Sequence, residues 1–169
     1  MFPLPAGPTG GCRPLPASSL PGLVSPLVRS IRAELDEELG RSVEQELTRI
    51  ASTFDPGRDF ILGHGPEAEP DGFLIALHGE AEGAGTTVVF WSVDPSARGQ
   101  GVGKALLCEA FREAARLGLP ALRVRCLASS AGAARVLWEC GFRVVYLAGA
   151  LFAGRRREFV VFEQEVTGP

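Results

Sequence analysis

The segment DPSARGQGVGKALL, residues 94–107, constrains the fold more than any other part of the sequence. It places three glycines and two cations between a run rich in β-formers and a run with helical periodicity. A glycine-rich turn between a strand and a helix lets backbone N–H groups approach an anion closely, most often a phosphate. The sequence therefore predicts a strand, a phosphate-binding turn and a helix in this order.

The spacing of these glycines does not fit two common phosphate loops. A Walker A loop needs a glycine where the chain has Arg98 and a metal-binding hydroxyl where it has Ala105. Arginine cannot follow the glycine backbone path and alanine cannot ligate magnesium, so nucleotide hydrolysis is not expected. The Rossmann pattern fails as well, because its third glycine would fall on Lys104 or Leu106.

The remainder of the chain indicates one mixed α/β (α+β) domain over residues 26–169, with no internal repeat. Runs of β-formers bounded by turn residues predict strands over 27–31, 59–62, 72–78, 86–93, 121–126, 142–147 and 157–166. Apolar residues at three- and four-residue steps predict helices over 35–54 with a break near Gly40, over 100–117 and over 131–140.

The first 25 residues carry six prolines, which interrupt both a signal-peptide core and a membrane-spanning helix. We therefore expect a disordered extension there, and a soluble protein with no membrane partner, since no later run approaches about 18 apolar residues. The four cysteines lie far apart and form no zinc-binding pattern, which predicts reduced thiols in a cytoplasmic protein without a metal. A net charge of −3 gives no support to a nucleic-acid partner.

Three motifs together resemble the GCN5-related N-acetyltransferase (GNAT) family. The spacing R-x-x-G-x-G of Arg98, Gly101 and Gly103 resembles the family's acetyl-CoA pyrophosphate loop. The V-x-P of residues 93–95 matches the end of its fourth strand, and SSAGAARVLWECGF, residues 129–142, lines up with N-x-x-A-x-x-L-Y-x-x-x-G-F. The resemblance implies a mostly antiparallel sheet of six to seven strands with one parallel strand–helix–strand crossover over residues 86–126.

The resemblance also implies where acetyl-CoA would bind as co-substrate. Main-chain N–H groups at the start of the helix would face the pyrophosphate, whose charge the positive helix end favours. Arg98 and Lys104 would add charge-assisted contacts. The implied cofactor-binding residues are Trp91, Ser92, Val93, Arg98, Gly99, Gln100, Gly101, Val102, Gly103, Lys104 and Ser130.

For catalysis, the resemblance implies direct attack of an amine on the acetyl carbon, with a backbone N–H near Val93 polarising the thioester carbonyl. The chain departs from the family where protons are handled. Leu137 replaces the tyrosine that protonates the leaving thiolate in many members, Ser130 replaces an asparagine, and Arg125 stands where some members have a basic glutamate. Thiolate can leave unassisted near neutral pH, because its pKa is about 8.5. The candidate proton carriers are Tyr146, Glu80, Glu82 and His78.

Two functions stay open at this point. One is an acetyl-CoA-dependent N-acetyltransferase for a small-molecule or peptide amine, working as a monomer or as a homodimer. The other is an acyl-CoA-binding sensor or interaction domain without turnover, which the missing proton carriers favour. For the enzyme, an acceptor amine of low pKa is expected, because only about 1 in 2,500 lysine-like amines of pKa 10.4 is neutral at pH 7. An Arg125 that faces the reacting groups would also favour an acceptor with its own carboxylate.

Overall fold

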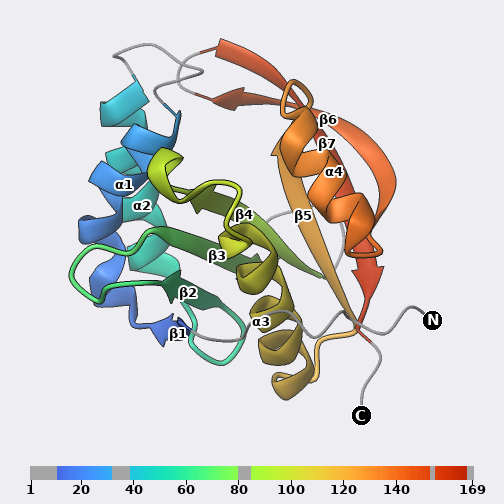
Figure 1. Ribbon diagram of the computed structural model, residues 1–169, viewed down its shortest axis with the longest axis horizontal. Helices are drawn as coiled ribbons and strands as arrows, with labels where there is room; N and C mark the ends of the chain where they lie inside the picture. Colours follow the sequence, from blue (N-terminus) through green and yellow to red (C-terminus); the bar gives the residue numbers. More distant parts are fainter. Residues whose placement is uncertain (1–10, 32–38, 80–84, 153–154, 167–169) are drawn as a thin grey trace.

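A computed structural model describes residues 11–31, 39–79, 85–152 and 155–166 (Figure 1). It contains one seven-stranded sheet in the order β1-β2-β3-β4-β5-β7-β6, antiparallel except where β4 pairs with β5. This confirms the predicted mixed sheet and its parallel crossover. The strands are β1 (Cys12–Leu15), β2 (Phe60–His64), β3 (Gly72–His78), β4 (Thr86–Val93), β5 (Ala121–Leu127), β6 (Arg143–Phe152) and β7 (Arg155–Glu165).

Helices cover both faces of this sheet (Figure 1). The 3-10 helix η1 (Ala17–Leu23), α1 (Val24–Ile31) and α2 (Leu39–Thr53) share a core with one face of β2, β3 and β4. A second core on the opposite face holds α3 (Val102–Arg116) and α4 (Ala131–Glu139), together with side chains from β2 through β5 and from β7. Strands β5 and β7 also have a face on the side of the sheet where α1 and α2 lie. Among the described residues, none on that face of β5 or β7 belongs to either core.

The predicted disordered extension is wrong for residues 12–25, which form β1, η1 and the start of α1. Leu20, Leu23 and Leu27 are almost completely buried, at steps of three and four residues that give a helix one apolar side. The prolines are compatible with this order, because Pro14 lies in an edge strand and Pro21 in a short 3-10 helix. The same leucine spacing explains why residues 27–31 are helical and not the predicted strand.

Helix α3 begins at Val102 instead of the predicted Gln100. Gly101 has a φ of +82°, a left-handed conformation that ends any helical path before it. The apolar side of α3, which includes Leu106 and Phe111, is buried. Its far end is closed by Gly118, which has a φ of +67°. No helix in the described ranges is both long and apolar enough to cross a membrane.

Candidate functional site

Strands β4 and β5 pair over only three residue pairs and then separate (Figure 1). The last pair joins Val88 to Val124, although β4 continues to Val93 and β5 to Leu127. The separation begins beside a β-bulge, since Val88 lies opposite Ala76 and Phe90 opposite Ile75, which leaves Val89 as an extra residue. A bulge bends its strand and increases the local twist. The bulge accounts for β4 staying paired with β3 while it separates from β5.

Backbone groups of β4 face this separation. The Asp94 N–H donates to the Asp71 carbonyl over 2.7 Å, which continues the β3–β4 ladder beyond Val93. In an antiparallel ladder only every second residue bonds to its partner. The N–H groups of Trp91 and Val93 therefore point away from β3, towards the side that β5 has left. Sequence reasoning placed the oxyanion donor at Val93 but did not foresee the bulge, since TTVVFWSV holds no glycine to mark it.

The loop between β4 and α3 is ordered by its own side chains. The Asp94 carboxylate accepts hydrogen bonds from the Ser96 N–H and hydroxyl, over 3.0 and 2.7 Å, and begins the 3-10 turn η2 (Pro95–Ala97). The Gln100 amide donates to the Ser96 carbonyl, and Arg98 Nε donates to the Val93 carbonyl over 3.3 Å. The Arg98 guanidinium is thereby held where β4 meets the loop.

The three glycines of the loop have different roles. Gly99 and Gly101 have φ values of +76° and +82°, and a Cβ on either would meet no atom within 4 Å. The space in front of Gly101 is therefore open, as an approaching anion requires. Gly103 has a packing role as well, because a Cβ there would lie 3.1 Å from the Trp91 ring. It allows Trp91 to pack beneath α3, where the indole donates to the Gly103 carbonyl over 3.2 Å.

The first turn of α3 presents N–H groups at this open space. The Ala105 N–H donates the first helical bond to the Gly101 carbonyl, so the N–H groups of Val102, Gly103 and Lys104 precede it. Gly101 has no side chain to cap them. Helix α3 approaches β3 closely because Gly72 has no Cβ, which would lie 2.6 Å from Val102. The uncapped turn and the helix dipole favour a phosphate here.

The candidate proton carriers lie at different distances from the separation. Tyr146 pairs with Val161 of β7, which in turn pairs with Arg125 of β5, so the three side chains lie on one sheet face. Because β7 lies between them, β6 is about 10 Å from β5. His78 ends β3, where its ring lies 3.3 Å from the Thr86 hydroxyl. Residues 80 and 82 lie outside the described residues. Leu137 is completely buried, and Ser130 precedes α4 without a side-chain cap.

Three of the four cysteines, Cys12, Cys126 and Cys140, are poorly suited to act as nucleophiles. Burial raises the pKa of the Cys126 thiol to about 11. The pKa of the Cys12 thiol is also raised to about 11, chiefly by burial and next by the nearby Glu109 carboxylate. The pKa of Cys140 is raised chiefly by burial. Thiols with such pKa values are protonated near neutral pH and react slowly. Among the described residues no three metal-ligating side chains cluster.

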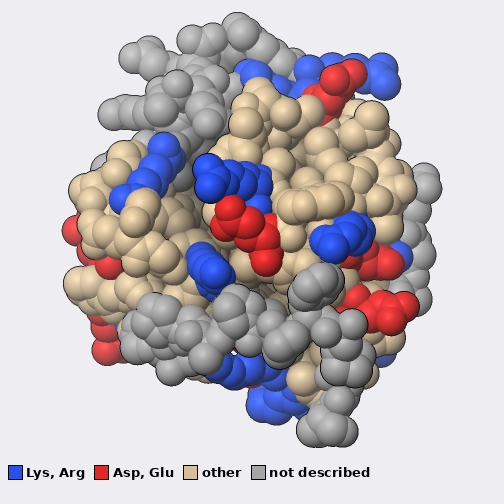
Figure 2. Space-filling view, turned by 45° about the vertical axis from the view of Figure 1, so that its right-hand side comes forward, with Lys and Arg blue, Asp and Glu red and all other residues tan. Residues whose placement is uncertain are grey.

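Charges near α3 and α4 are largely paired. Arg112 with Glu109, Arg116 with Glu113 and Arg135 with Glu139 form ion pairs of 2.5 to 2.9 Å within these helices. Figure 2 shows acidic and basic side chains next to one another on a face that is otherwise mostly uncharged. Such exposed pairs contribute little to stability.

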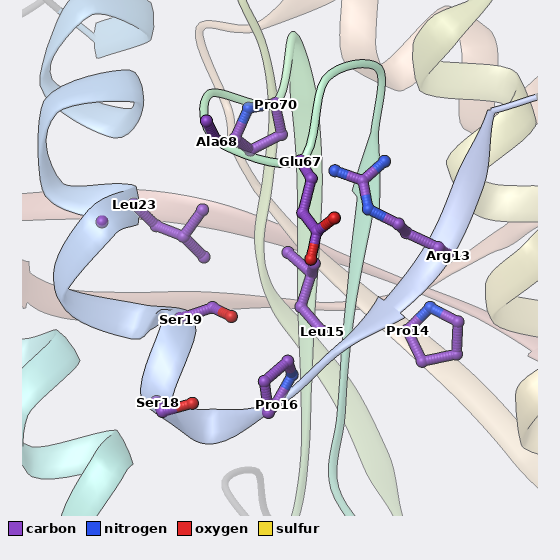
Figure 3. Close-up of a pocket in the computed structure, with 11 residues that line it drawn as sticks. Arg13, Pro14, Leu15, Pro16, Ser18, Ser19, Leu23, Glu67, Ala68 and Pro70 are labelled. Carbon is purple, nitrogen blue, oxygen red and sulfur yellow. The ribbon is translucent and has the colours of Figure 1, made fainter.

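A second hollow, of about 280 Å³, lies between β1, η1 and the loop joining β2 to β3 (Figure 3). Arg13 and Glu67 extend into it, and Ser19 and Leu23 form part of its wall. Arg13 also donates to the Gly65 carbonyl. None of the residues predicted for acetyl-CoA or catalysis lines this hollow.

Comparisons with known proteins identify the family of this chain. Residues 28–142 match the family model described as acetyltransferase (GNAT) family. A mycothiol acetyltransferase of Clavibacter sepedonicus is 38% identical over 84 residues, which are 50% of this chain and 26% of that protein. The match therefore spans about a quarter of that relative's length.

Two solved structures share the fold over nearly their whole length. The ribosomal-protein-S18-alanine N-acetyltransferase of Escherichia coli has a TM-score of 0.70 at 18% identity, covering 94% of each chain. Arabidopsis thaliana NAA60, solved with a bisubstrate analogue, has a TM-score of 0.67 at 20% identity, covering 94% of this chain and 98% of its own. The fold and the loop define an acyltransferase of the GNAT type. This chain belongs to the GNAT acetyltransferase family.

Proposed function

We propose that the protein is an acetyl-CoA-dependent N-acetyltransferase that acts on the amine of a small molecule or peptide. The observation that carries this proposal is the uncapped first turn of α3, open in front of Gly101 and next to two strands that separate. An anion site and an unpaired strand face, side by side, suit a ligand with a pyrophosphate and an extended arm that contains amides.

The residues present fit this co-substrate. The N–H groups of Gly101 to Lys104 would hold the pyrophosphate, with Arg98 and Lys104 supplying positive charge. The free face of β4 from Trp91 to Val93 would pair with the amides of the pantetheine arm. Gly99, Gln100, Val102 and Ser130 would complete the site, as the family resemblance implies.

Acetyl-CoA supplies an activated acetyl thioester. The Val93 N–H would donate to the thioester oxygen as negative charge develops on it, which stabilises the transition state without any special side chain. The acceptor nitrogen forms a bond to the acetyl carbon, the carbon–sulfur bond breaks, and the thiolate leaves with the electron pair. The thiolate leaves without a tyrosine at the family's position, which is the buried Leu137. The proton lost by the amine passes to water, to the thiolate or to a side chain.

Proton transfer by a protein side chain remains part of the proposal, with Tyr146 and Glu80 as candidates. At about 10 Å from β5, Tyr146 would reach the leaving sulfur through water more easily than directly. Replacing it by phenylalanine should lower kcat in that case and leave acetyl-CoA binding as it is. The same comparison with Glu80→Gln tests the carboxylate.

Two measurements test the proposed function. Acetyl-CoA should raise the melting temperature, because a ligand at a hundred times its Kd adds about 2.7 kcal/mol to the free energy of unfolding. Mixing with acetyl-CoA and a panel of amines should release free thiol with at least one of them. No change in melting temperature at millimolar acetyl-CoA would refute the proposal. Binding without thiol release from any amine would favour the acyl-CoA sensor instead.

A further inference from the structure

The sheet face beside the separated strands carries three arginines. Arg123 and Arg125 alternate on β5 with Leu122, Val124 and Cys126, whose side chains are buried against α3 and α4. The two arginines therefore point to the opposite face, where α1 and α2 cover only the other half of the sheet. Arg157 lies on the same face of β7, two residues before Phe159, which pairs with Leu127.

The three cations differ in their surroundings. Arg123 Nε donates to the Glu163 carboxylate over 2.6 Å, so its charge is already balanced. The Arg125 guanidinium lies 4.9 Å from the centroid of the Phe159 ring, which fixes the cation over an aromatic face. Arg157 is half-buried, and its Nε is buried with no hydrogen-bond partner among the described residues. A buried N–H without a partner is destabilising unless a ligand supplies an acceptor.

Arg125 and Arg157 both lie beyond the last residue pair that joins β4 to β5. Arg125 is the first residue of β5 beyond its last pair with β4. The Arg125 guanidinium lies over the Phe159 ring, and Arg157 is the next residue along β7 on the same face as Phe159. Phe159 pairs with Leu127, the last residue of β5. A carboxylate bound beside Phe159 would therefore have two arginines near it on one sheet face, and planar guanidinium groups match carboxylates through paired hydrogen bonds.

We propose, resting on the proposed function, that the acceptor is an amino-acid-like amine whose own carboxylate is held by Arg125 and Arg157 at the open end of the separation between β4 and β5. Its nitrogen would then face the acetyl group beside β4. An α-amine also suits a site with no carboxylate base on β4, because it is less basic than a lysine side chain and leaves more neutral amine at pH 7.

The test compares each of the twenty L-amino acids with its own α-carboxamide as acceptor at pH 7, using thiol release to obtain kcat/KM. The carboxamide has the less basic amine, so a larger fraction of it is neutral at pH 7. If only this fraction mattered, the carboxamide would have the higher kcat/KM. We expect at least one amino acid to exceed its carboxamide by tenfold or more. Amines without a carboxylate, such as spermidine, should be poorer still.

Variants assign that preference to the two arginines. Arg157→Gln and Arg125→Gln should each lower the ratio of acid to carboxamide by about tenfold, the loss of one charge-assisted contact. Arg156→Gln is the matched control, because Arg156 is exposed and alternates to the opposite face of β7. Its ratio should equal that of the wild type. Melting curves of all three variants exclude unfolding as the cause.

The outcomes separate this inference from the proposed function. Turnover with amines but no preference for any acid, or an unchanged ratio in both arginine variants, overturns the inference and leaves the enzyme proposal intact. If coenzyme A binds and no amine turns over, the melting temperature of the protein bound to coenzyme A provides the test. N-acetyl amino acids should then raise the melting temperature of the wild type more than their carboxamides do. This difference should be smaller in the Arg157→Gln variant. Equal stabilisation by acid and carboxamide refutes the carboxylate site.

Discussion

Replacing Gly101 by alanine tests whether the start of α3 binds the pyrophosphate, and Gly118→Ala supplies a matched control. Both glycines have left-handed φ values, +82° and +67°, and flank the same helix. A Cβ on either meets no atom within 4 Å, so neither variant creates a clash. The left-handed conformation costs a residue with a Cβ about 1 to 2 kcal/mol. Each variant should therefore melt roughly 2 to 8 °C lower, by similar amounts.

Binding of coenzyme A should distinguish the two variants. The new methyl group of Gly101→Ala would project into the open space before the α3 N–H groups, whereas that of Gly118→Ala lies at the opposite end of the helix. Loss of one charge-assisted hydrogen bond, about 1.5 to 3 kcal/mol, corresponds to a Kd raised roughly ten- to 150-fold. Gly101→Val should do at least as much damage. Calorimetric titration of folded protein gives the Kd, and the same Kd in both alanine variants would show that the loop does not contact the phosphates.

Three further outcomes follow from other positions. Ala105→Ser should leave the Kd for coenzyme A within about twofold of the wild type and create no magnesium dependence, because the residue is buried and faces the core; a magnesium-dependent gain would support a nucleotide loop. Leu137→Tyr should lower stability by about 1 to 3 kcal/mol through overpacking, with no gain in thiol release; faster release would show that the position reaches the leaving sulfur. Burial raises the pKa of the Cys126 thiol from 9.0 to about 11, so folded protein holds this proton more tightly than unfolded protein does. Stability should fall between pH 9 and pH 11, and Cys126→Val should lessen the fall in melting temperature measured at both pH values.

The order of strand, glycine-rich loop and helix could be predicted because its signals are local. Glycines at left-handed positions and an Asp-Pro start act within a few residues, so the order strand, loop and helix could be inferred directly. Whether Arg125 faces the reacting groups is only a condition at the level of the sequence. The structure places its side chain on the sheet face opposite α3 and α4.

The bulge and the N-terminal segment could not be inferred in the same way. Val89 becomes an extra residue only through the register of β4 against β3, and nothing within TTVVFWSV indicates it. In the N-terminal segment, six prolines obscure the helical spacing of Leu20, Leu23 and Leu27. Those leucines gain their stability from a core with β2 and β3, which lie far along the chain.

The separation of β4 from β5 gives this sheet four edges instead of two. Besides β1 and β6, the inner sides of β4 after Val88 and of β5 after Val124 have no strand beside them in the described residues. The two halves of the sheet are joined by three residue pairs and by the connection through α3. An extended ligand with amides would act as a short strand along one inner edge, adding main-chain bonds of the kind that hold the halves together. Ligand occupancy and the cooperativity of unfolding would then rise together, so amide hydrogen exchange at Trp91 and Val93 would report both at once.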